Sequence, residues 1–432
     1  MEVIVIGGGY AGLSTGALLV KKGFKVILLE KKQILGGRAM SFRDDEGFHR
    51  EYGQHSHRLG EDGPAYAVFR ALGEKIEFVE AEYPPGCYYK GKLYPRPDSP
   101  MKLLRSPILP FRAGIQAVRV LIKMIRSNPE QWFDKTVKEF YRRHFSPIPE
   151  VEDLLDLFSF TIMVPKADYC SAGELIDFLR RALRAKRKAG TPKGGSAQVI
   201  GKLHSIITTG GGEVRLGEKV KEIRVKDNQV EGVETDRQSY SARAVVFAAP
   251  VRELLELVSP ELLPDSLVNF ARNLESTSSI ILEWITEEPI AQSGLILGMG
   301  VPFWAHFPTI EDPSLAPAGK HLSVFCWMME RGKGSDPEHQ KESEKKLREH
   351  IENLFPKASE KVLDERKIIV PVQNGALLKP RQSRPFRPKI EETGIRGLYL
   401  AGDTVSAGGV SGDIAFSSAL LVAEKISRDL SL

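Results

Sequence analysis

The sequence predicts an α/β protein of two domains: one with a Rossmann-like parallel sheet and a β-meander, the other a discontinuous α+β domain. Three observations predict this fold. An apolar strand at the N-terminus runs into a glycine-rich turn and a helix; a second strand, glycine turn and helix lie near the C-terminus; and buried-strand patterns lie between them. The length of 432 residues also exceeds what one compact core usually needs.

The N-terminal segment carries the most specific pattern. An apolar strand leads into Gly7-x-Gly9-x-x-Gly12, a helix-like run follows, and a second apolar strand ends at Glu30. This order of elements is the β-α-β fingerprint of a dinucleotide site, in which Gly7 permits the turn, Gly9 admits the pyrophosphate and Gly12 lets the helix approach the sheet. The helix N-terminus receives the phosphate charge, and a carboxylate at the end of the second strand binds the adenosine ribose. We expect cofactor contacts at Gly7, Gly9, Tyr10, Ala11, Gly12 and Glu30.

The fingerprint alone does not separate NAD from FAD, but two other segments favour FAD. Lys31 follows the ribose carboxylate, and Gly36-Gly37-Arg38 then offers close backbone approach and a cation for a phosphate or the flavin edge. Near the C-terminus a strand ends in Gly402-Asp403 and leads into a glycine-rich turn with Asp413 and a helix from Ile414. Asp403 is expected beside the pyrophosphate or ribityl hydroxyls, and the helix N-terminus is expected to stabilise negative charge on the flavin pyrimidine.

With these motifs the chain resembles the flavin-containing amine oxidase superfamily, and within it the carotenoid (phytoene) desaturase-like oxidoreductases. The matching stretches are residues 3–42, 192–203, 214–223 and 397–426. The resemblance implies an FAD cofactor whose adenine is bound by the backbone of Val220, with Lys31 beside the ribose and Asp403 at the ribityl–phosphate region. Ser406–Gly409 lacks the cysteine that binds flavin covalently in many amine-oxidising members, so we expect noncovalent FAD.

The domain prediction divides the chain into five segments. Residues 1–90, 191–254 and 371–432 are assigned to the FAD-binding domain, and 91–190 (mostly helical) and 255–370 (mixed sheet) to the substrate domain. Within the second FAD-binding segment, a helix is expected at 196–209, followed by a β-meander with strands near 214–216, 220–225, 230–235 and 244–249. Turns are expected at 227–228 and 237–239.

Composition excludes several function classes. The net charge of +5 is too small to indicate nucleic-acid binding, and Cys87, Cys170 and Cys326 lack metal or redox spacing, so buried thiols and no metal are expected. No apolar stretch reaches the ~18 residues that a spanning helix needs, and the apolar N-terminus does not have the pattern of a signal peptide. We expect a cytoplasmic protein, with peripheral contact with the membrane as the alternative. No second GxGxxG follows, so the expected electron acceptor is oxygen, a quinone or an unidentified molecule.

Residues 111–126 have a clear helical period with two interpretations. Arg112, Gln116, Arg119, Lys123 and Arg126 share one narrow arc, and large apolar residues occupy the opposite side. In one interpretation the apolar side packs on the substrate domain and the basic side faces water. In the other, the helix lies in a membrane interface and admits a lipid-soluble substrate.

Candidate catalytic groups are few. His55 and His57 lie in the segment after Glu51-Tyr52-Gly53, where family members carry a glycine-rich segment over the flavin, and either side chain can act as a base or polarise the substrate. Structural hydrogen bonding is the alternative role for both. His306 beside Trp304 has the same two interpretations.

The leading functional hypothesis is an FAD-dependent desaturase, dehydrogenase or isomerase that removes hydride from a hydrophobic, isoprenoid- or carotenoid-like substrate to flavin N5. A soluble amine, amino-acid or protoporphyrinogen oxidase on the same fold is one alternative, and a noncatalytic flavin-binding protein is another. Residues 375–384 lack the aromatic residue expected of amine-oxidising members, which favours the first hypothesis. The sequence leaves the substrate, the electron acceptor and the oligomeric state open.

Overall fold

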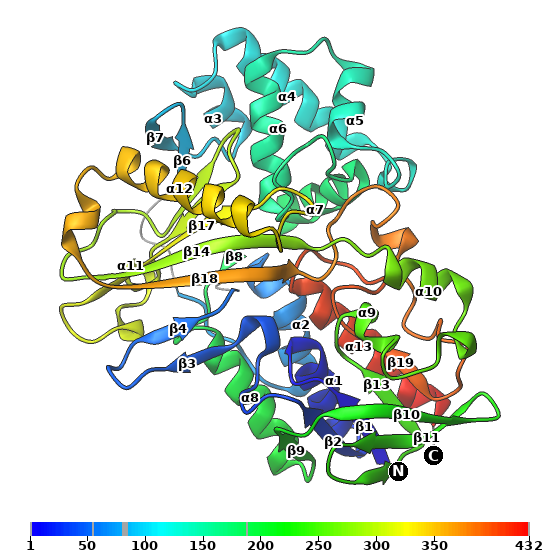
Figure 1. Ribbon diagram of the computed structural model, residues 1–432. Helices are drawn as coiled ribbons and strands as arrows, with labels where there is room; N and C mark the ends of the chain where they lie inside the picture. Colours follow the sequence, from blue (N-terminus) through cyan, green and yellow to red (C-terminus); the bar gives the residue numbers. More distant parts are fainter. Residues whose placement is uncertain (1, 54–55, 80–84, 187–188, 431–432) are drawn as a thin grey trace.

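A five-stranded parallel sheet forms the lower half of the molecule in Figure 1. The computed structural model describes residues 2–53, 56–79, 85–186 and 189–430. β1 lies at the centre of this sheet and pairs in parallel with both β2 and β13. The strands are β19 (Leu398–Leu400), β13 (Ala244–Phe247), β1 (Glu2–Ile6), β2 (Lys25–Glu30) and β9 (Glu213–Leu216), in that spatial order. Their apolar side chains are buried almost without interruption, as in sheets covered on both faces.

Helices from both ends of the chain pack together on this sheet. α1 lies against α13 and α8, and α2 also contacts α13, so the N-terminal and C-terminal segments share one core. Figure 1 shows the two termini close together. These helices are α1 (Tyr10–Lys21), α2 (Pro64–Leu72), α8 (Ser196–Thr209) and α13 (Asp413–Asp429).

The strands after α8 differ from the expected four-stranded meander. β9 and β13 both belong to the parallel sheet, and the antiparallel sheet contains only β10 (Val220–Lys226), β11 (Gln229–Thr235) and β12 (Ser239–Ser241). The turn at Asp227-Asn228 is correct, with positive φ at both residues. The third strand lies at 239–241, where the sequence predicts the end of a turn, because so short an exposed strand lacks a hydrophobic pattern.

A seven-stranded mixed sheet forms a second layer above the first (Figure 1). β14 is buried along its whole length because it pairs with β18 on one side and β17 on the other. The order is β18 (Val362–Asn374), β14 (Thr277–Thr286), β17 (His321–Met328), β16 (Phe303–His306), β15 (Leu295–Gly298), β6 (Gly86–Tyr89) and β7 (Lys92–Pro95). The β6–β7 hairpin spans the expected boundary at residue 90, and the division of the chain into domains stays a prediction.

Most helices of the 91–190 segment stand beyond this second sheet. They are α3 (Pro100–Arg105), α4 (Phe111–Arg126), α5 (Val137–His144), α6 (Pro149–Thr161) and α7 (Ala172–Arg184). α12 (Pro337–Leu354) packs across β17 and β14. The shorter helices are α9 (Val251–Leu254), α10 (Asp265–Arg272) and α11 (Pro308–Glu311), and the two remaining strand pairs are β3 (Ser41–Arg43) with β4 (His49–Glu51) and β5 (His57–Arg58) with β8 (Ala189–Gly190).

The structure confirms the predicted fold class, and the three cysteines are buried thiols as expected. Across the described part of the chain, none of the helices combines the length and apolar character needed to cross a bilayer. The same residues contain no cluster of three or more side chains suited to hold a metal ion.

Candidate functional site

A large cavity lies between the two sheets and reaches into the helical part. Its volume is about 1150 Å³, larger than the ~300–1,000 Å³ of typical small-molecule sites, so it has room for more than one ligand. Turns of the parallel sheet line one part of it, and apolar side chains of α4, α6, α7, β15 and β16 line another.

The glycine turn after β1 lines the cavity with backbone atoms. Gly7 has a positive φ of 106°, and a Cβ on Gly12 would lie 1.9 Å from the Gly7 carbonyl oxygen, so both positions need glycine for the turn and for close helix packing. Gly9 differs, because a Cβ there would meet no protein atom closer than 3.9 Å. The space in front of Gly9 therefore belongs to the cavity and not to the protein core.

Glu30 closes this turn from the neighbouring strand. Its carboxylate accepts hydrogen bonds from the N–H of Gly8 at 2.7 Å and the N–H of Lys32 at 2.8 Å. Lys31 also lines the cavity, and its Nζ lies 2.7 Å from a carboxylate oxygen of Glu253. In addition to lining the cavity, Glu30 thus fixes the turn that carries the glycines.

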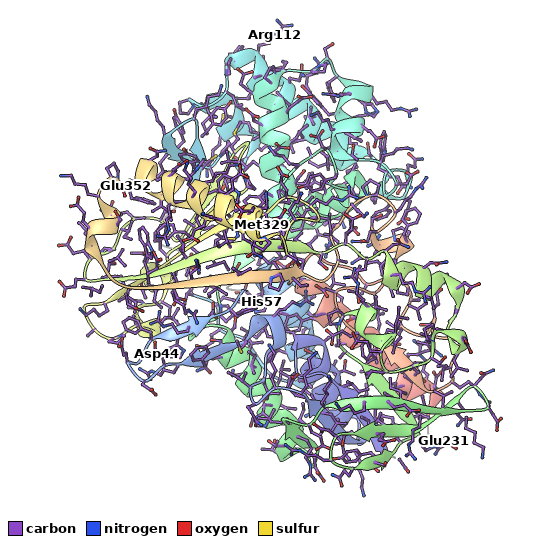
Figure 2. All side chains as sticks on the ribbon, in the orientation of Figure 1. Asp44, His57, Arg112, Glu231, Met329 and Glu352 are labelled. Atoms are coloured by element: carbon purple, nitrogen blue, oxygen red, sulfur yellow. The ribbon has the colours of Figure 1, made fainter. Side chains whose placement is uncertain are left out.

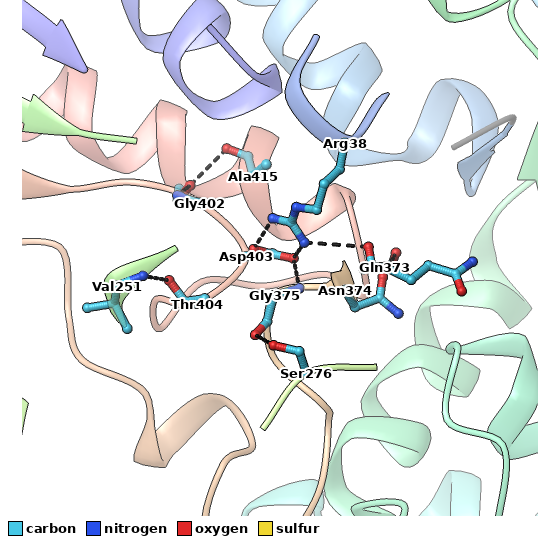
Figure 3. A network of polar contacts seen from close by, with 12 residues as sticks. Arg38, Val251, Ser276, Gln373, Asn374, Gly375, Gly402, Asp403, Thr404 and Ala415 are labelled. Atoms are coloured by element: carbon cyan, nitrogen blue, oxygen red, sulfur yellow. Dashed lines mark hydrogen bonds and ion pairs between the residues drawn. The ribbon is translucent and has the colours of Figure 1, made fainter. Parts of the chain in front are cut away.

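Arg38 and Asp403 join the two chain ends at the cavity wall. Two guanidinium nitrogens of Arg38 each donate to a carboxylate oxygen of Asp403 at 2.7 Å, and the Gly375 N–H donates to the same carboxylate (Figure 3). Burial opposes ionisation of Asp403, but the charge and hydrogen bonds of Arg38 hold its pKa below the usual range. The pair stays ionised at neutral pH and holds the Gly36–Arg38 turn against the end of β19.

The N-terminus of α13 adds a buried carboxyl group to the wall. Asp413 lines the cavity and is 2% exposed, and burial raises its pKa to about 7, although Arg58 and Arg181 act in the opposite direction. Val220 lines the cavity from β10. Ile414, in contrast, is buried and is absent from the lining residues.

The turns that line the cavity fit a dinucleotide. The first turn of α1 has no side-chain cap and no acidic residue, so its N–H groups are available for phosphate oxygens. Gly9 and Gly402 both face open space, and Gly402 would place a Cβ with no neighbouring atom within 4 Å. Side chains at these positions would occupy the cavity, which explains glycine there and supports FAD as the ligand.

The rest of the cavity wall is mainly apolar. Side chains of α6, α7 and the β15–β16 hairpin form this surface, and those used below are Leu157, Phe160, Leu179, Ala182 and Trp304. Trp304 and His306 both line the cavity. His306 Nε2 lies 3.4 Å from Glu311 Oε2, and the Thr191 hydroxyl donates to the same oxygen at 2.7 Å.

α4 buries only part of its apolar surface. The residues packed inward are mostly small, among them Ala113, Gly114 and Ala117, whereas Ile115 is 40% and Ile122 43% exposed. Val118, Leu121, Ile122 and Ile125 line the cavity. Figure 2 shows Arg112 projecting from the outer end of the helical part. An exposed apolar strip therefore runs between the cavity and the basic side of the helix, and simple packing on the domain does not account for it.

The structure does not support His57 as a catalytic base. Its ring is 1% exposed, packs against Tyr10 and Phe416, and is absent from the cavity lining. Burial lowers its pKa to about 4, so it is neutral at physiological pH. The ring faces the core because adjacent residues of β5 face opposite sides, and a catalytic role of His57 stays a prediction. His55 lies outside the described residues.

Most predicted cofactor contacts gather on one cavity, and a few do not. Those that line it are Gly7, Gly9, Tyr10, Ala11, Glu30, Lys31, Gly36, Gly37, Arg38, Val220, Gly402, Asp403 and Asp413. Gly12 supports the turn from behind, and Ile414 lies in the core. Their contacts with FAD stay predictions.

Two arginines on the cavity wall escaped the sequence analysis. Arg58 is the second residue of β5, and Arg96 stands between Pro95 and Pro97. Neither belongs to a motif or a periodic pattern. The only signal for Arg58 was the alternation of side chains along a strand. If His57 faces the core, its neighbour Arg58 faces the opposite side, toward the cavity.

Comparisons with known proteins agree with this geometry. Residues 10–427 match the family model for flavin containing amine oxidoreductases. The chain is 25% identical over 285 residues to a 15-cis-phytoene desaturase of Solanum lycopersicum; that match covers 60% of this chain and 48% of the plant protein, so the chain matches about half of that relative's length. It is 23% identical to a lycopene-forming phytoene desaturase of Pseudescherichia vulneris, over 97% of this chain and 98% of that protein.

Solved structures show the same fold. An oxidoreductase from Methanosarcina mazei superposes with a TM-score of 0.82 at 22% identity, over 98% of this chain and all of that one.

Proposed function

This chain belongs to the flavin-containing amine oxidoreductase family, and from that premise we propose that it is an FAD-dependent dehydrogenase or desaturase of a hydrophobic, isoprenoid- or carotenoid-like substrate. Membership of the family makes the protein a flavin-dependent oxidoreductase. The observation that carries the finer proposal is the continuity of the cavity, in which the glycine turns and the apolar walls line one space.

The residues of the chain have three tasks in this reaction. The turn at Gly7–Ala11 and the Arg38–Asp403 pair hold the dinucleotide, and the apolar walls orient the substrate and exclude water. When bound, the flavin supplies the redox chemistry by taking a hydride from a substrate C–H at N5. Because the walls of the apolar part carry few polar side chains, substrate recognition there depends on shape and burial.

Candidates for moving a proton are restricted to polar groups that line the cavity. The His306–Glu311 pair and Asp413 meet this condition, and His57 does not. Desaturation of a C–C bond releases a proton as well as a hydride, so a buried carboxyl group with a pKa near neutrality is suited to hold it.

We assign the exposed strip on α4 to peripheral contact with a membrane. Ile115 and Ile122 are exposed beside a basic face that contains Arg112, Arg119 and Lys123, as in helices that lie in a lipid interface. Since Ile122 also lines the cavity, a lipid-soluble substrate can pass from the bilayer into the cavity along this strip.

Anaerobic reduction of the bound flavin tests the proposed activity. The purified yellow holoenzyme is mixed with carotenoid precursors, porphyrinogens and amines, and flavin absorbance near 450 nm is followed in each case. We expect a hydrophobic polyene precursor to bleach the flavin and amines to leave it oxidised. Bleaching by amines with release of peroxide on re-oxidation would instead establish the amine oxidase alternative. Re-oxidation by oxygen compared with a quinone then identifies the acceptor.

Liposome flotation tests the membrane contact. Ile122→Ser is expected to lower binding to anionic vesicles severalfold, because it removes apolar surface from the interface. Leu421→Ser on α13 is the matched control, since Leu421 is also 43% exposed but lies on the other layer. Equal flotation of the wild type and both variants would overturn this contact without affecting the proposed activity.

A further inference from the structure

Two arginines that no cofactor motif includes line the cavity together. Arg58 belongs to β5, and Arg96 directly follows β7, so two separate sheets contribute them. The positive charge of Arg58 contributes to lowering the pKa of Arg96, after the larger effect of burial, which places the two groups near one another. Two like charges on one cavity wall repel and need a compensating charge.

Neither guanidinium makes an ion pair with a carboxylate of the described residues. Arg58 donates from Nε to the Thr161 carbonyl at 3.2 Å and from Nη1 to the Ser56 hydroxyl at 3.3 Å, and both acceptors are neutral. The side chain of Arg96 has no hydrogen bond to a described residue. Burial lowers the pKa of both arginines, because protein atoms replace water around them.

Three other arginines that are buried or half-buried have acidic partners. Arg38 binds Asp403 at 2.7 Å, Arg50 binds Glu283 at 2.5 Å, and Arg387 binds Glu174 at 2.8 Å. A buried cation without such a partner is costly, and proteins normally pair it. Arg58 and Arg96, which are half-buried at the cavity wall, differ from these three arginines.

Among the residues that the structure describes, the carboxyl groups that act on these arginines do not supply the missing charge. Asp98, which acts on Arg96, is held by Lys102 at 2.8 Å. Asp413, which acts on Arg58, has one carboxyl oxygen without a hydrogen-bond partner among the described residues. Its pKa of about 7 leaves it partly protonated at neutral pH, because burial outweighs the attraction of the arginines.

We propose that Arg58 and Arg96 bind an anionic head group, a carboxylate or a phosphate, carried by the hydrophobic substrate. This inference rests on the proposed function and makes the substrate an amphiphile instead of a neutral hydrocarbon. Carboxylates and phosphates share the geometry that a guanidinium binds with two parallel hydrogen bonds. Leu157, Phe160 and Leu179 line the same cavity and accommodate the apolar chain.

Binding of matched ligands to the FAD-loaded protein tests this site. Hexadecanoate, hexadecyl phosphate, hexadecanol and inorganic phosphate are titrated separately, and affinity is measured by calorimetry. We expect at least one of the two anionic amphiphiles to bind about tenfold or more tightly than the alcohol, because charged hydrogen bonds are stronger than neutral ones. The tighter of the two identifies the head group. Equal affinity of both anions and the alcohol, or equal affinity of hexadecyl phosphate and inorganic phosphate, would overturn the proposal.

Variants assign the preference to the two arginines. Arg96→Gln is expected to abolish most of the preference for the anion and to leave affinity for hexadecanol within about twofold, while Arg96→Lys keeps part of it. Arg58→Gln provides a second, independent substitution. Arg184→Gln, at the exposed end of α7, is the control and should bind all ligands as the wild type does.

Two results would contradict the assignment. An anion preference that persists in both Arg58→Gln and Arg96→Gln would show that another group binds the head. A loss of FAD from these variants with the preference intact would assign the arginines to the cofactor.

The outcomes separate this site from the proposed function. Bleaching of the flavin by a neutral polyene without any anion preference would overturn the head-group site and leave the activity in place. Tight anion binding with a flavin that no compound of the panel reduces would overturn the activity and leave the site in place.

Discussion

The part of the cavity that we assign to the cofactor and the part that we assign to the substrate are built from different atoms. Backbone turns around Gly7, Gly9 and Gly402 form the cofactor part, and one side-chain pair, Arg38–Asp403, connects them. The substrate part consists of side chains from α4, α6, α7 and the β15–β16 hairpin. A backbone cradle constrains a few glycines in short motifs, whereas a side-chain wall is spread over distant segments. The glycine turns can therefore be recognised from a sequence. The side-chain wall belongs to no short motif, so a sequence does not reveal it.

Substitutions at two glycines of the cofactor part distinguish a structural role from a ligand-binding role. Gly12→Ala places a Cβ 1.9 Å from the Gly7 carbonyl oxygen, and we expect a loss of about 4 kcal/mol or more in the free energy of unfolding. Gly9→Ala meets no protein atom closer than 3.9 Å, so the apoprotein should keep its stability and bind FAD at least about tenfold more weakly. Thermal denaturation and flavin titration measure the two effects. Wild-type FAD affinity in Gly9→Ala would show that the cradle lies elsewhere.

Loss of the Arg38–Asp403 ion pair should have the next largest effect on the free energy of unfolding. Asp403→Asn leaves the Arg38 charge without its partner, and we expect a loss of about 2–4 kcal/mol at pH 7, moderated because 34% of the Arg38 side chain is exposed. The folded-state pKa of Asp403 is depressed, so its contribution is present above the unfolded pKa and is lost as pH falls through the folded value. The difference between variant and wild type should therefore shrink below about pH 4. Asp98→Asn, with its exposed partner Lys102, serves as control and should change stability by less than about 1 kcal/mol.

Substitution of Asp413 should change the free energy of unfolding by less and in the opposite direction. Its folded-state pKa is raised to about 7, above the value in an unfolded chain, so the fold loses stability as pH rises from the unfolded value to about 7, and the loss is constant at higher pH. Asp413→Asn should raise the free energy of unfolding of the apoprotein by roughly 1–3 kcal/mol at pH 8 and by much less at pH 4. Urea denaturation at both pH values measures this. A gain that is the same at both would contradict the assigned protonation.

The smallest expected effect is that of His57 on the rate of flavin reduction, which tests whether this residue has a catalytic role. Because the ring is buried beside Tyr10 and Phe416 and lies off the cavity, His57→Gln should change the rate of flavin reduction by less than about threefold. Its pKa of about 4 also means that the pH–rate profile between 5 and 8 contains no step from this group. Stopped-flow reduction of the flavin measures both, and a loss of 100-fold or more would restore His57 as a base.

The sequence predicted the elements whose geometry is local. The β1–α1–β2 unit, the helix at 111–126, the 196–209 helix and the Gly402–Asp403 turn follow from short motifs or periodicity, and the structure has them. The meander was only partly correct, because strand pairing depends on distant partners such as β13 with β1. His57 and Arg58 show the same limit at one site, since neighbouring residues face opposite sides and nothing local decides which side faces the cavity.

Access to the flavin tests most directly that one cavity serves cofactor and substrate. The rate at which dithionite reduces bound FAD is measured with and without a saturating hydrophobic ligand whose binding is shown by calorimetry. If the apolar part opens onto the flavin, the ligand should slow reduction at least about tenfold, as exclusion of water and small solutes from a closed site requires. An unchanged rate with the ligand bound would contradict the account, because the two parts would then be separate sites.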